Sequence, residues 1–230
     1  MRRFWFSTHK WAGLVIGLQV MAWVVSGLFM TSVPIGTVRG EPHIRPPVPV
    51  DLRSADVRGI PLKLLRALPG VVTRLELASV NGNLVWRVDM NGKPGALIDD
   101  ATARVISPLD ETTAREIATS DFSGFGVVTA AVLLEANPPI EYRGDLPVWK
   151  LELNDADQTH IYVSPLSGKV VARRTSTWRI YDFLWSLHIM DYRTRDDFNN
   201  MLVIITAAGA LILTISGFGI LFYRMLLPRL

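Results

Sequence analysis

The sequence predicts an α+β protein with two transmembrane α-helices and a tandem pair of αβββ units between them. Two uncharged runs of 23 residues, Trp11–Val33 and Met201–Tyr223, predict the membrane helices. Each run is about 34 Å long as a helix, and a bilayer core is about 30 Å thick. A repeated strand pattern between the runs predicts the two units. The expected segments are an N-terminal helix over 1–35, a proline-rich extended linker over 36–52, αβββ units over 53–109 and 110–175, and an aromatic amphipathic helix with the C-terminal membrane helix over 176–230.

Basic residues flank the apolar runs on the terminal sides of the chain, and all 21 carboxylates lie between the runs. By the positive-inside rule, both termini are expected in the cytoplasm of a bacterium and the middle segment in the periplasm, with the helices in the inner membrane. The middle segment holds 19 of the 24 basic residues against 21 acidic ones, a net charge of −2. This balance argues against a nucleic-acid-binding protein. The flanking basic residues are Arg2, Arg3, Lys10, Arg224 and Arg229.

Several classes of protein are excluded by what the sequence lacks. The first apolar run is longer than the core of a signal peptide, and no clear A-x-A cleavage site follows it, which predicts an uncleaved anchor. The absence of cysteine excludes disulfides, thiolate metal sites and covalently attached c-type haem. No phosphate-binding glycine loop, H-E-x-x-H, G-x-S-x-G or EF-hand motif is present, so a soluble hydrolase or nucleotide site is not expected.

The middle segment repeats itself. The stretch Val85–Asn91 (VWRVDMN) matches Val148–Asn154 (VWKLELN) at an offset of 63, and 99–106 matches 164–171 after a two-residue insertion. Helices are predicted over 54–68, interrupted near Pro61, and over 110–120, with Asp110 or Thr112 as N-cap. Strands are predicted over 71–80, 83–90, 95–107, 147–154 and 159–174.

Some polar and aromatic residues of these units have ordinary structural interpretations. Trp86 and Trp149 occupy the same place in the two copies and are expected to be core residues, rather than a ligand platform. Carboxylates at turns are expected to be solvated. These carboxylates are Asp99, Asp100, Asp155 and Asp157.

Four histidines are the remaining candidates for chemistry. His43 is expected in a solvated loop, and His160 in a strand, with metal ligation as a lesser alternative. His9 precedes the first apolar run, and Gly13 and Gly17 follow it at helical spacing. Two interpretations of these glycines stand side by side: a close helix interface, or space for a flat macrocycle beside an axial imidazole.

The stretch TWRIYDFLWSLHIMDY carries the most specific pattern. At helical spacing its large aromatic residues and His188 fall on one face. One interpretation is an interfacial aromatic belt at headgroup level. The other is a dry wall and an axial nitrogen for haem, since a histidine beside a membrane span is a functional candidate. The aromatic members of this stripe are Trp178, Tyr181, Trp185 and Tyr192.

The chain resembles PepSY-associated transmembrane proteins over nearly its whole length, with the two αβββ units resembling PepSY domains. The resemblance is carried by the order of loose motifs: His-x-Trp-x-Gly at the start of the first run, Leu-His before the second, then a small-residue pair and an aromatic-basic end. These are His9, Trp11, Gly13, Leu187, His188, Ser216, Gly217, Phe222, Tyr223 and Arg224.

Larger four-span members of that family include b-haem proteins that reduce ferric iron or ferric siderophores. The resemblance therefore implies haem b held by His188 and His9, walled by the aromatic stripe, with electrons passing to periplasmic ferric iron. This chain has two spans only, so a homodimer is expected, giving a four-helix bundle in which the two-fold axis pairs His188 with its mate. With no flavin or nucleotide motif, a quinol or a separate reductase is the implied donor.

A non-enzymatic function is the alternative. In it the duplicated unit is a membrane-anchored module that binds a peptide, a protease or a partner transporter, and the aromatic stripe is a plain interface. Enzyme activity therefore stays open between the two.

Overall fold

The computed structural model describes residues 2–46, 51 and 55–226, with the side chains of 2–9, 220, 223, 224 and 226 outside the description. It is a mixed α/β structure with apolar helices at both ends and β-sheets in the middle, which confirms the predicted class at that level. The chain divides into two compact units, one formed by 1–34 with 180–230 and the other by 35–179.

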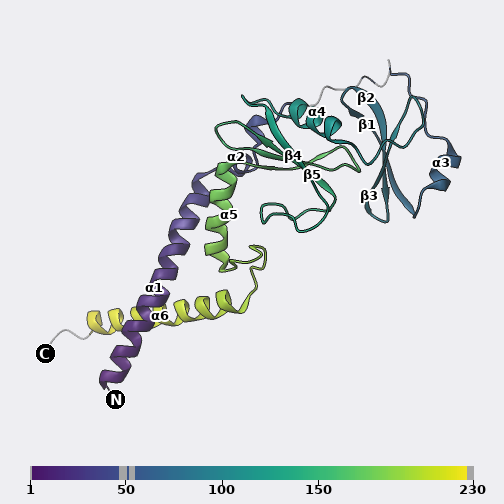
Figure 1. Cartoon of the computed structure of the whole chain (residues 1–230). Coiled ribbons are helices and arrows are strands. Elements are labelled where there is room, and N and C mark those ends of the chain that lie inside the picture. Colours follow the sequence, from purple (N-terminus) through teal and green to yellow (C-terminus); the bar gives the residue numbers. More distant parts are fainter. Residues whose placement is uncertain (1, 47–50, 52–54, 227–230) are drawn as a thin grey trace. The chain divides into compact units, whose positions relative to one another are not determined.

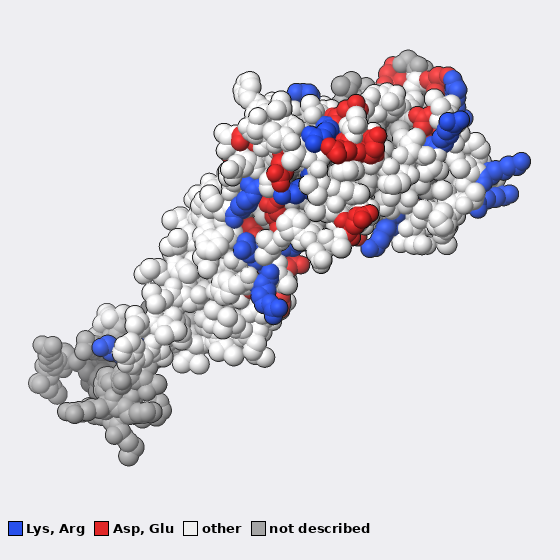
Figure 2. All heavy atoms as spheres, viewed as in Figure 1, with Lys and Arg blue, Asp and Glu red and all other residues white. Residues whose placement is uncertain are grey.

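The first unit contains α1 (Arg2–Ser32), the later part of α5 (Ser176–Ile189) and α6 (Met201–Leu226). Lys10–Ser32 and Met201–Gly219, with mean hydropathies of 1.9 and 2.3, are long and apolar enough to cross a membrane. Only 6% and 0% of their most apolar windows are buried inside the chain, unlike a core helix of a soluble protein. Figure 2 shows charged side chains gathered over the other unit, with few on the described terminal helices.

The helices of this unit meet at specific points. Figure 1 shows α6 passing across α1, and a Cβ added at Gly209 of α6 would lie 2.8 Å from Cδ1 of Ile16. Glycine is therefore the residue that allows this approach.

The end of α5 is capped by side chains from its neighbours. Gln19 and Trp23 of α1 donate to the carbonyl oxygens of Leu187 and His188, at 3.0 and 2.7 Å. Asn200 Nδ2 donates to the carbonyl of Ile189 at 2.8 Å, while Asn200 Oδ1 accepts from the backbone at the start of α6. Three carbonyls that the helix itself leaves unpaired are thus satisfied beside an apolar surface, where leaving them open would be costly.

The second unit holds two antiparallel sheets (Figure 1). The first has the order β1-β2-β3 and the second β4-β5-β6-β7. The strands are β1 (Val72–Val80), β2 (Asn83–Met90), β3 (Lys93–Asp99), β4 (Val128–Leu134), β5 (Val148–Leu153), β6 (His160–Val163) and β7 (Val170–Arg174). The helices are α2 (Ile35–Val38), a 3₁₀ turn η1 (Glu41–His43), α3 (Leu62–Ala67) and α4 (Glu111–Asp121).

One apolar core joins the two sheets through α4. It takes side chains from β1–β3, from α4 and from β5–β6, so neither sheet encloses it alone. α3 covers the opposite side of the first sheet around Val88 and Ile98, and the loop after β4 covers the opposite side of the second sheet around Tyr142 and Tyr162. The shared core consists of Val80, Val85, Leu97, Leu109, Ala114, Ile117, Ala118, Phe122, Leu151, Leu153, Ile161 and Val163.

The repeat seen in the sequence recurs in the hydrogen bonds of the two sheets. Asn91 Oδ1 accepts from the backbone N–H of Val71, and Asn154 Oδ1, 63 residues later, accepts from that of Val127. In each case the asparagine backbone N–H also donates back to the same residue's carbonyl. The two asparagines therefore close equivalent strand pairs with the same geometry.

The two sheets differ at their last strand. Val163 of β6 pairs with Val170 at the start of β7, and the equivalent pair in the first sheet is an isolated bridge between Ile98 and Val105. The fourth strand of the second sheet is thus reduced to a single bridge in the first.

Several local predictions can be compared with these elements. Asp110 is the N-cap of α4, accepting from the backbone N–H of Thr113 at 2.9 Å, as predicted. Strands β1, β2 and β5 lie where the alternating patterns place them. β4 was not predicted, because its run VTAAVLL has no polar alternation and is flanked by glycine rather than by a recognisable hairpin turn.

The prediction of an extended linker over 36–52 is wrong in its first part. α2 and η1 form there, Val38 and Gly40 are buried, and Ile44 pairs with Phe122 in an isolated bridge. The prolines limit regular structure, but Val38 and Ile44 are apolar enough to pack the segment onto its unit. Residues 47–50 of the predicted linker lie outside the described residues.

Replacing Leu97, which is fully buried in the shared core, by Ala should lower the free energy of unfolding by about 2–5 kcal/mol. Because the core includes both sheets, denaturation followed by circular dichroism and tryptophan fluorescence should give one shifted transition. Leu133→Ala on the exposed face of β4 is the control and should change stability little. Separate transitions for the two sheets would contradict a common core.

Candidate functional site

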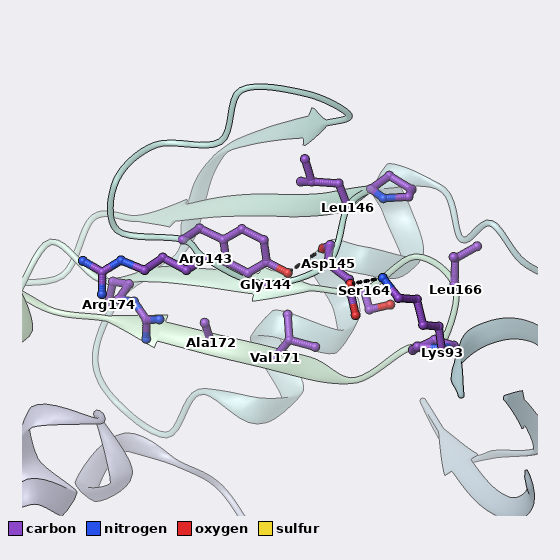
Figure 3. A pocket seen from close by; sticks show the side chains of 13 residues that line it. Lys93, Arg143, Gly144, Asp145, Leu146, Ser164, Leu166, Val171, Ala172 and Arg174 are labelled. Carbon is purple, nitrogen blue, oxygen red and sulfur yellow. Dashed lines mark hydrogen bonds and ion pairs between the residues drawn. The ribbon is translucent and has the colours of Figure 1, made fainter. Parts of the chain in front are cut away.

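A cavity of about 490 Å³ lies on the side of the second sheet opposite α4 (Figure 3). One wall is β7 with the β6–β7 turn, another is the loop between β4 and β5, and the start of β3 reaches it from the first sheet. Its volume falls in the range of sites that hold small ligands or a few peptide residues. The lining residues are Lys93, Pro94, Tyr142, Arg143, Gly144, Asp145, Leu146, Pro147, Ser164, Leu166, Val171, Ala172 and Arg174.

The loop over the cavity is held in shape by Tyr142. The Tyr142 ring stacks on that of Tyr162, with centroids 4.6 Å apart, and its hydroxyl donates to the carbonyl of Asp145 at 2.8 Å. A Cβ at Gly144 would lie 2.5 Å from the Tyr142 hydroxyl oxygen, so only glycine fits there. The wall of the cavity is therefore a folded loop with its own packing.

The charge around the cavity is mostly positive. Lys93 pairs with Asp145 at 3.0 Å, but both side chains are well exposed, so the pair contributes little stability. Arg143 and Arg174 also line the cavity, which leaves three cationic side chains against one carboxylate (Figure 3). A ligand that carries a negative group is favoured by this lining.

A buried ionic cluster lies next to the cavity and is centred on Glu141. The carboxylate accepts from Tyr162 at 2.7 Å and from Arg179 Nε at 3.0 Å, and it lies 2.5 Å from Nδ1 of His160. Arg174 Nε donates to the Glu141 carbonyl at 2.6 Å, and its guanidinium lies 4.3 Å above the Trp178 ring. The start of α5 is thereby fixed to the second sheet.

The contacts of His160 assign its Nδ1 proton. Arg179 Nη2 lies 2.9 Å from Nδ1, and Glu141 Oε1 lies 2.5 Å from the same atom. Arginine can only donate and carboxylate can only accept. The shorter contact is satisfied when Nδ1–H donates to Glu141, and the guanidinium then lies beside the imidazole without bonding to it. His160 is thus a structural member of the cluster.

Burial by itself raises the pKa of Glu141, but the surrounding donors reverse this effect. Hydrogen bonds from His160 and Tyr162 and the positive charges of His160 and Arg179 lower the pKa of Glu141 to about 2. Burial and the neighbouring carboxylate of Glu141 both raise the pKa of the Tyr162 hydroxyl. The cluster therefore keeps an ionised carboxylate under a neutral tyrosine.

His188 lies at a second candidate site, inside the helical unit. Its Nδ1 is 2.9 Å from Oγ of Ser26, a fully buried residue of α1. The rings of Trp185 and Trp23 each lie with centroids 6.5 Å from the imidazole, the first nearly parallel to it. A Cβ at Gly27 would lie 3.9 Å from Cε1 of His188, in ordinary contact.

The hydrogen bonds of Ser26 indicate the tautomer of His188. Ser26 Oγ donates to the carbonyl of Trp23 at 3.2 Å, which uses its single proton. With that proton on the Trp23 carbonyl, the hydroxyl accepts from Nδ1–H of His188 and the lone pair of the imidazole is on Nε2. Within the described residues Nε2 makes no hydrogen bond, and an imidazole held at Nδ1 in this way is the usual state of a metal-ligating histidine.

The predicted aromatic stripe forms only in part. α5 ends at Ile189, Met190 has a positive φ of 55°, and Tyr192 lies beyond the helix and is half exposed. The predicted helical face is therefore wrong at Tyr192, whereas Trp178 lies on α5 as predicted, with the Arg174 guanidinium over its ring. The local cause of the early end is Asp191, which accepts from the backbone N–H groups of the following turn.

The middle of the stripe is helical as predicted. Tyr181 is half-buried on α5, and Trp185 Nε1 donates to the carbonyl of Arg195 at 3.2 Å. Arg195 in turn pairs with the buried Asp182 at 2.7 Å. The α5–α6 loop is therefore folded back against α5.

Of the predicted N-terminal site residues, only the surroundings of Gly13 and Gly17 are described. His9 is in α1, but its side chain lies outside the described residues. A Cβ at Gly13 or Gly17 would meet no described atom within 4 Å, so neither glycine is packed against another part of the described chain.

The residues at His188 fit one bond to the iron of the implied haem, because Ser26 holds Nδ1 and the rings of Trp23 and Trp185 lie near the imidazole. Tyr192 lies beyond the end of α5 and does not continue this aromatic lining. Among the described residues, no group of three or more metal-ligating side chains comes together.

Several residues differ from their sequence interpretation or were not identified by it. Asp100, expected in solvent, is buried and accepts from Trp86 Nε1 at 2.7 Å and from the backbone N–H of Arg58 and Gly59. Trp149 Nε1 donates to the carbonyl of Leu109, so both repeat tryptophans pack at the core. Sequence reasoning did not identify Ser26, Glu141 or the loop 142–147, because no motif marks them. For the site in the helical unit, the only signal in the sequence was the set of residues around His188, which pointed to α5.

Residues 108–174 match the family model described as "PepSY: Peptidase propeptide and YPEB domain". The match covers α4 and the whole second sheet, together with the cavity-forming loop. The chain therefore contains a PepSY domain flanked by two candidate membrane helices. No curated protein and no solved structure matches the chain.

Acid should destabilise the second unit through Glu141. Its carboxyl has a pKa of about 2 when folded and about 4.5 when unfolded, so the unfolded chain takes up the proton first as pH falls. The stability it contributes is complete above about pH 4.5 and is lost toward pH 2, on the order of 3 kcal/mol. Thermal unfolding measured across this range should reveal the slope.

The matched variants for this experiment are Glu141→Gln and Glu135→Gln, the latter at an exposed position. Gln at 141 should lower stability at neutral pH and flatten the slope below pH 4.5, whereas Gln at 135 should do neither. An acid slope unchanged in Glu141→Gln would rule out this carboxylate as its source.

Proposed function

We propose that the chain is a membrane-anchored PepSY module that holds an extended polypeptide segment of a partner protein in the cavity beside β7. The proposal places the module outside the cytoplasm, tethered to the inner membrane by α1 and α6. The main support for this proposal is the cavity of about 490 Å³ beside β7, an edge strand of the region that matches the PepSY model.

The edge strand supports binding of an extended chain. β7 is last in the order β4-β5-β6-β7, so within the described residues it has a strand neighbour on one side only. Val171 on this strand is 47% exposed and lines the cavity. An added peptide strand pairs through its backbone with such an edge and takes its specificity from side chains that enter adjacent pockets.

The lining supports a preference for acidic-aliphatic segments. Leu146, Leu166 and Val171 offer apolar contacts, and the positive charge of Lys93, Arg143 and Arg174 around the cavity favours a carboxylate. The family description names peptidase propeptides, so a propeptide-like module that contacts a partner polypeptide is consistent with it. The function is accordingly one of binding, in which the ionic cluster under Glu141 keeps the cavity wall rigid.

Fluorescence anisotropy with two labelled peptides tests this function on the full chain in detergent. An alternating Val/Glu probe should bind at least ten-fold more tightly than an alternating Val/Lys probe, because the cavity is cationic. Arg143→Glu should reduce or reverse that preference, and Arg45→Glu, at an exposed position outside the cavity, should leave it. Equal binding of both probes, unaffected by Arg143→Glu, would reject the cavity as a peptide site.

A second candidate function is favoured by the geometry of His188. We propose as the alternative that the helical unit of a homodimer carries haem b and passes electrons to ferric iron or a ferric siderophore. His188 would provide an axial nitrogen, Ser26 would orient the imidazole, and Trp23 and Trp185 would exclude water beside it. When bound, haem supplies a one-electron Fe(III)/Fe(II) couple. The second ligand would be His188 of the partner subunit or His9, and a quinol or separate reductase would donate electrons.

Spectra of membranes that contain the chain test this alternative. A Soret band and a pyridine haemochrome of b type are expected, and His188→Ala should remove them. Ser26→Ala should weaken haem retention by about ten- to hundred-fold, the usual effect of losing such a support. His43→Ala, on an exposed turn of the other unit, is the control. A haem-free protein from haem-replete cells would reject this function and leave the peptide-binding function untouched.

A further inference from the structure

We infer that the Gly124–Gly126 loop is a lipid-contact site, at which Phe125 and Val127 enter the interfacial region of the membrane that α1 and α6 are suited to cross. The surface is defined by Phe125 and Val127, just before β4. The inference rests on the membrane anchoring in the proposed function and is independent of what the cavity binds.

The exposure of these two side chains is unusual for their type. Phe125 is 100% exposed and Val127 is 64% exposed. The loop beneath them is nevertheless closely packed: a Cβ at Gly124 would lie 2.5 Å from the Phe122 ring, and one at Gly126 would lie 3.0 Å from Cβ of Asp155. The backbone is therefore seated on the unit while the phenyl ring is held away from it.

The loop lies among segments that lead to the membrane helices. The backbone N–H of Ser123 donates to the carbonyl of His43 at 3.0 Å, and Val127 is bonded to Asn154 in the β5–β6 turn. That turn also receives the start of α5, because Ser176 N–H donates to the carbonyl of Asp157 at 2.8 Å. One end of the second sheet thus gathers the incoming segment, the outgoing helix and Phe125.

Connectivity limits how far the second unit can lie from the end of the first span. Two residues lie between Ser32, the last of the α1 span, and Ile35, the first of the PepSY-bearing unit. Such a connection reaches about 10 Å at most. On the same segment, a Cβ at Gly40 would lie 3.7 Å from Cγ2 of Thr175, just before α5. The chain therefore enters and leaves the unit at the end that carries the loop.

Lipid is a better occupant than protein for so small a surface. Two exposed apolar side chains, Phe125 and Val127, offer far less than the roughly 800 Å² per partner of a stable protein interface. A single aromatic ring suffices at a membrane interface, where aromatic residues concentrate and the chain is already anchored. Arg39 and Arg45, both exposed on the incoming segment, are suited to lipid phosphates nearby.

The absence of native cysteine permits a clean test by spin labelling of the full chain in nanodiscs of phosphatidylethanolamine and phosphatidylglycerol. A nitroxide at Ser123→Cys, an exposed neighbour that leaves Phe125 in place, should be reached by oxygen and protected several-fold from a water-soluble nickel complex. Ala136→Cys is the aqueous control, since it is exposed just beyond the other end of β4, about 23 Å away. Adding Phe125→Ser to Ser123→Cys should move the label toward water.

Each further outcome has one meaning. If Ser123→Cys is as accessible to nickel as Ala136→Cys, the loop is in water and the inference is wrong. If it is protected from both oxygen and nickel, protein covers the loop, which also overturns the inference. Leu18→Cys, on the exposed surface of α1, distinguishes failure of the membrane anchoring from failure of the loop inference. A label at this position that is not in lipid rejects the anchoring itself.

Discussion

The PepSY-bearing unit depends on one apolar core that two sheets and α4 enclose together. Leu97 from the first sheet and Leu151 and Ile161 from the second are all fully buried in it. A three-stranded sheet with a six-residue helix has too little apolar surface to fold reliably alone. Duplication supplies the missing surface, since each copy covers what the other would expose to water.

This arrangement decides where a ligand can bind. Because the shared core occupies one face of the second sheet, a covering loop or a ligand can reach only the opposite face and the edges at β4 and β7. The loop between β4 and β5 covers that face through the stacked rings of Tyr142 and Tyr162, and Glu141 anchors its start to Arg174 and Arg179. The cavity is thus bordered by an ionic cluster whose members form hydrogen bonds and ion pairs with one another. A fully hydrogen-bonded cluster of this kind resists rearrangement.

The helical unit follows a different physical rule. Beside apolar side chains, an unpaired carbonyl finds no water, and Gln19, Trp23 and Asn200 donate to the last carbonyls of α5. Ser26 and His188 are paired for the same reason. The hydrogen bond between Ser26 and Nδ1 of His188 satisfies two buried polar groups. When Nδ1 is the donor, Nε2 carries the lone pair, so the same side chain can serve the packing of the helices and also bind a ligand.

Local patterns in the sequence were sufficient for much of the fold. Two long uncharged runs indicate the terminal helices, alternation with Asn-Gly turns indicates β1 and β2, and Asp110 before a polar-apolar helix indicates the start of α4. Each of these signals arises within a few neighbouring residues, where hydrophobic period and capping chemistry act directly. The repeat at an offset of 63 was visible for the same reason, because both copies keep their turn asparagines.

Tertiary structure decided what those patterns could not contain. The last carbonyls of α5 accept from side chains of α1 and from Asn200, and the burial of Asp100 depends on Trp86 and on the backbone near Gly59. Ser26 lies 162 residues from His188, and Glu141 lies 38 residues from Arg179. Hydrogen bonds and ion pairs between such distant positions leave no period or motif in a single chain, since they form only after folding brings the partners together. The sequence therefore determined the elements, and their packing determined the sites.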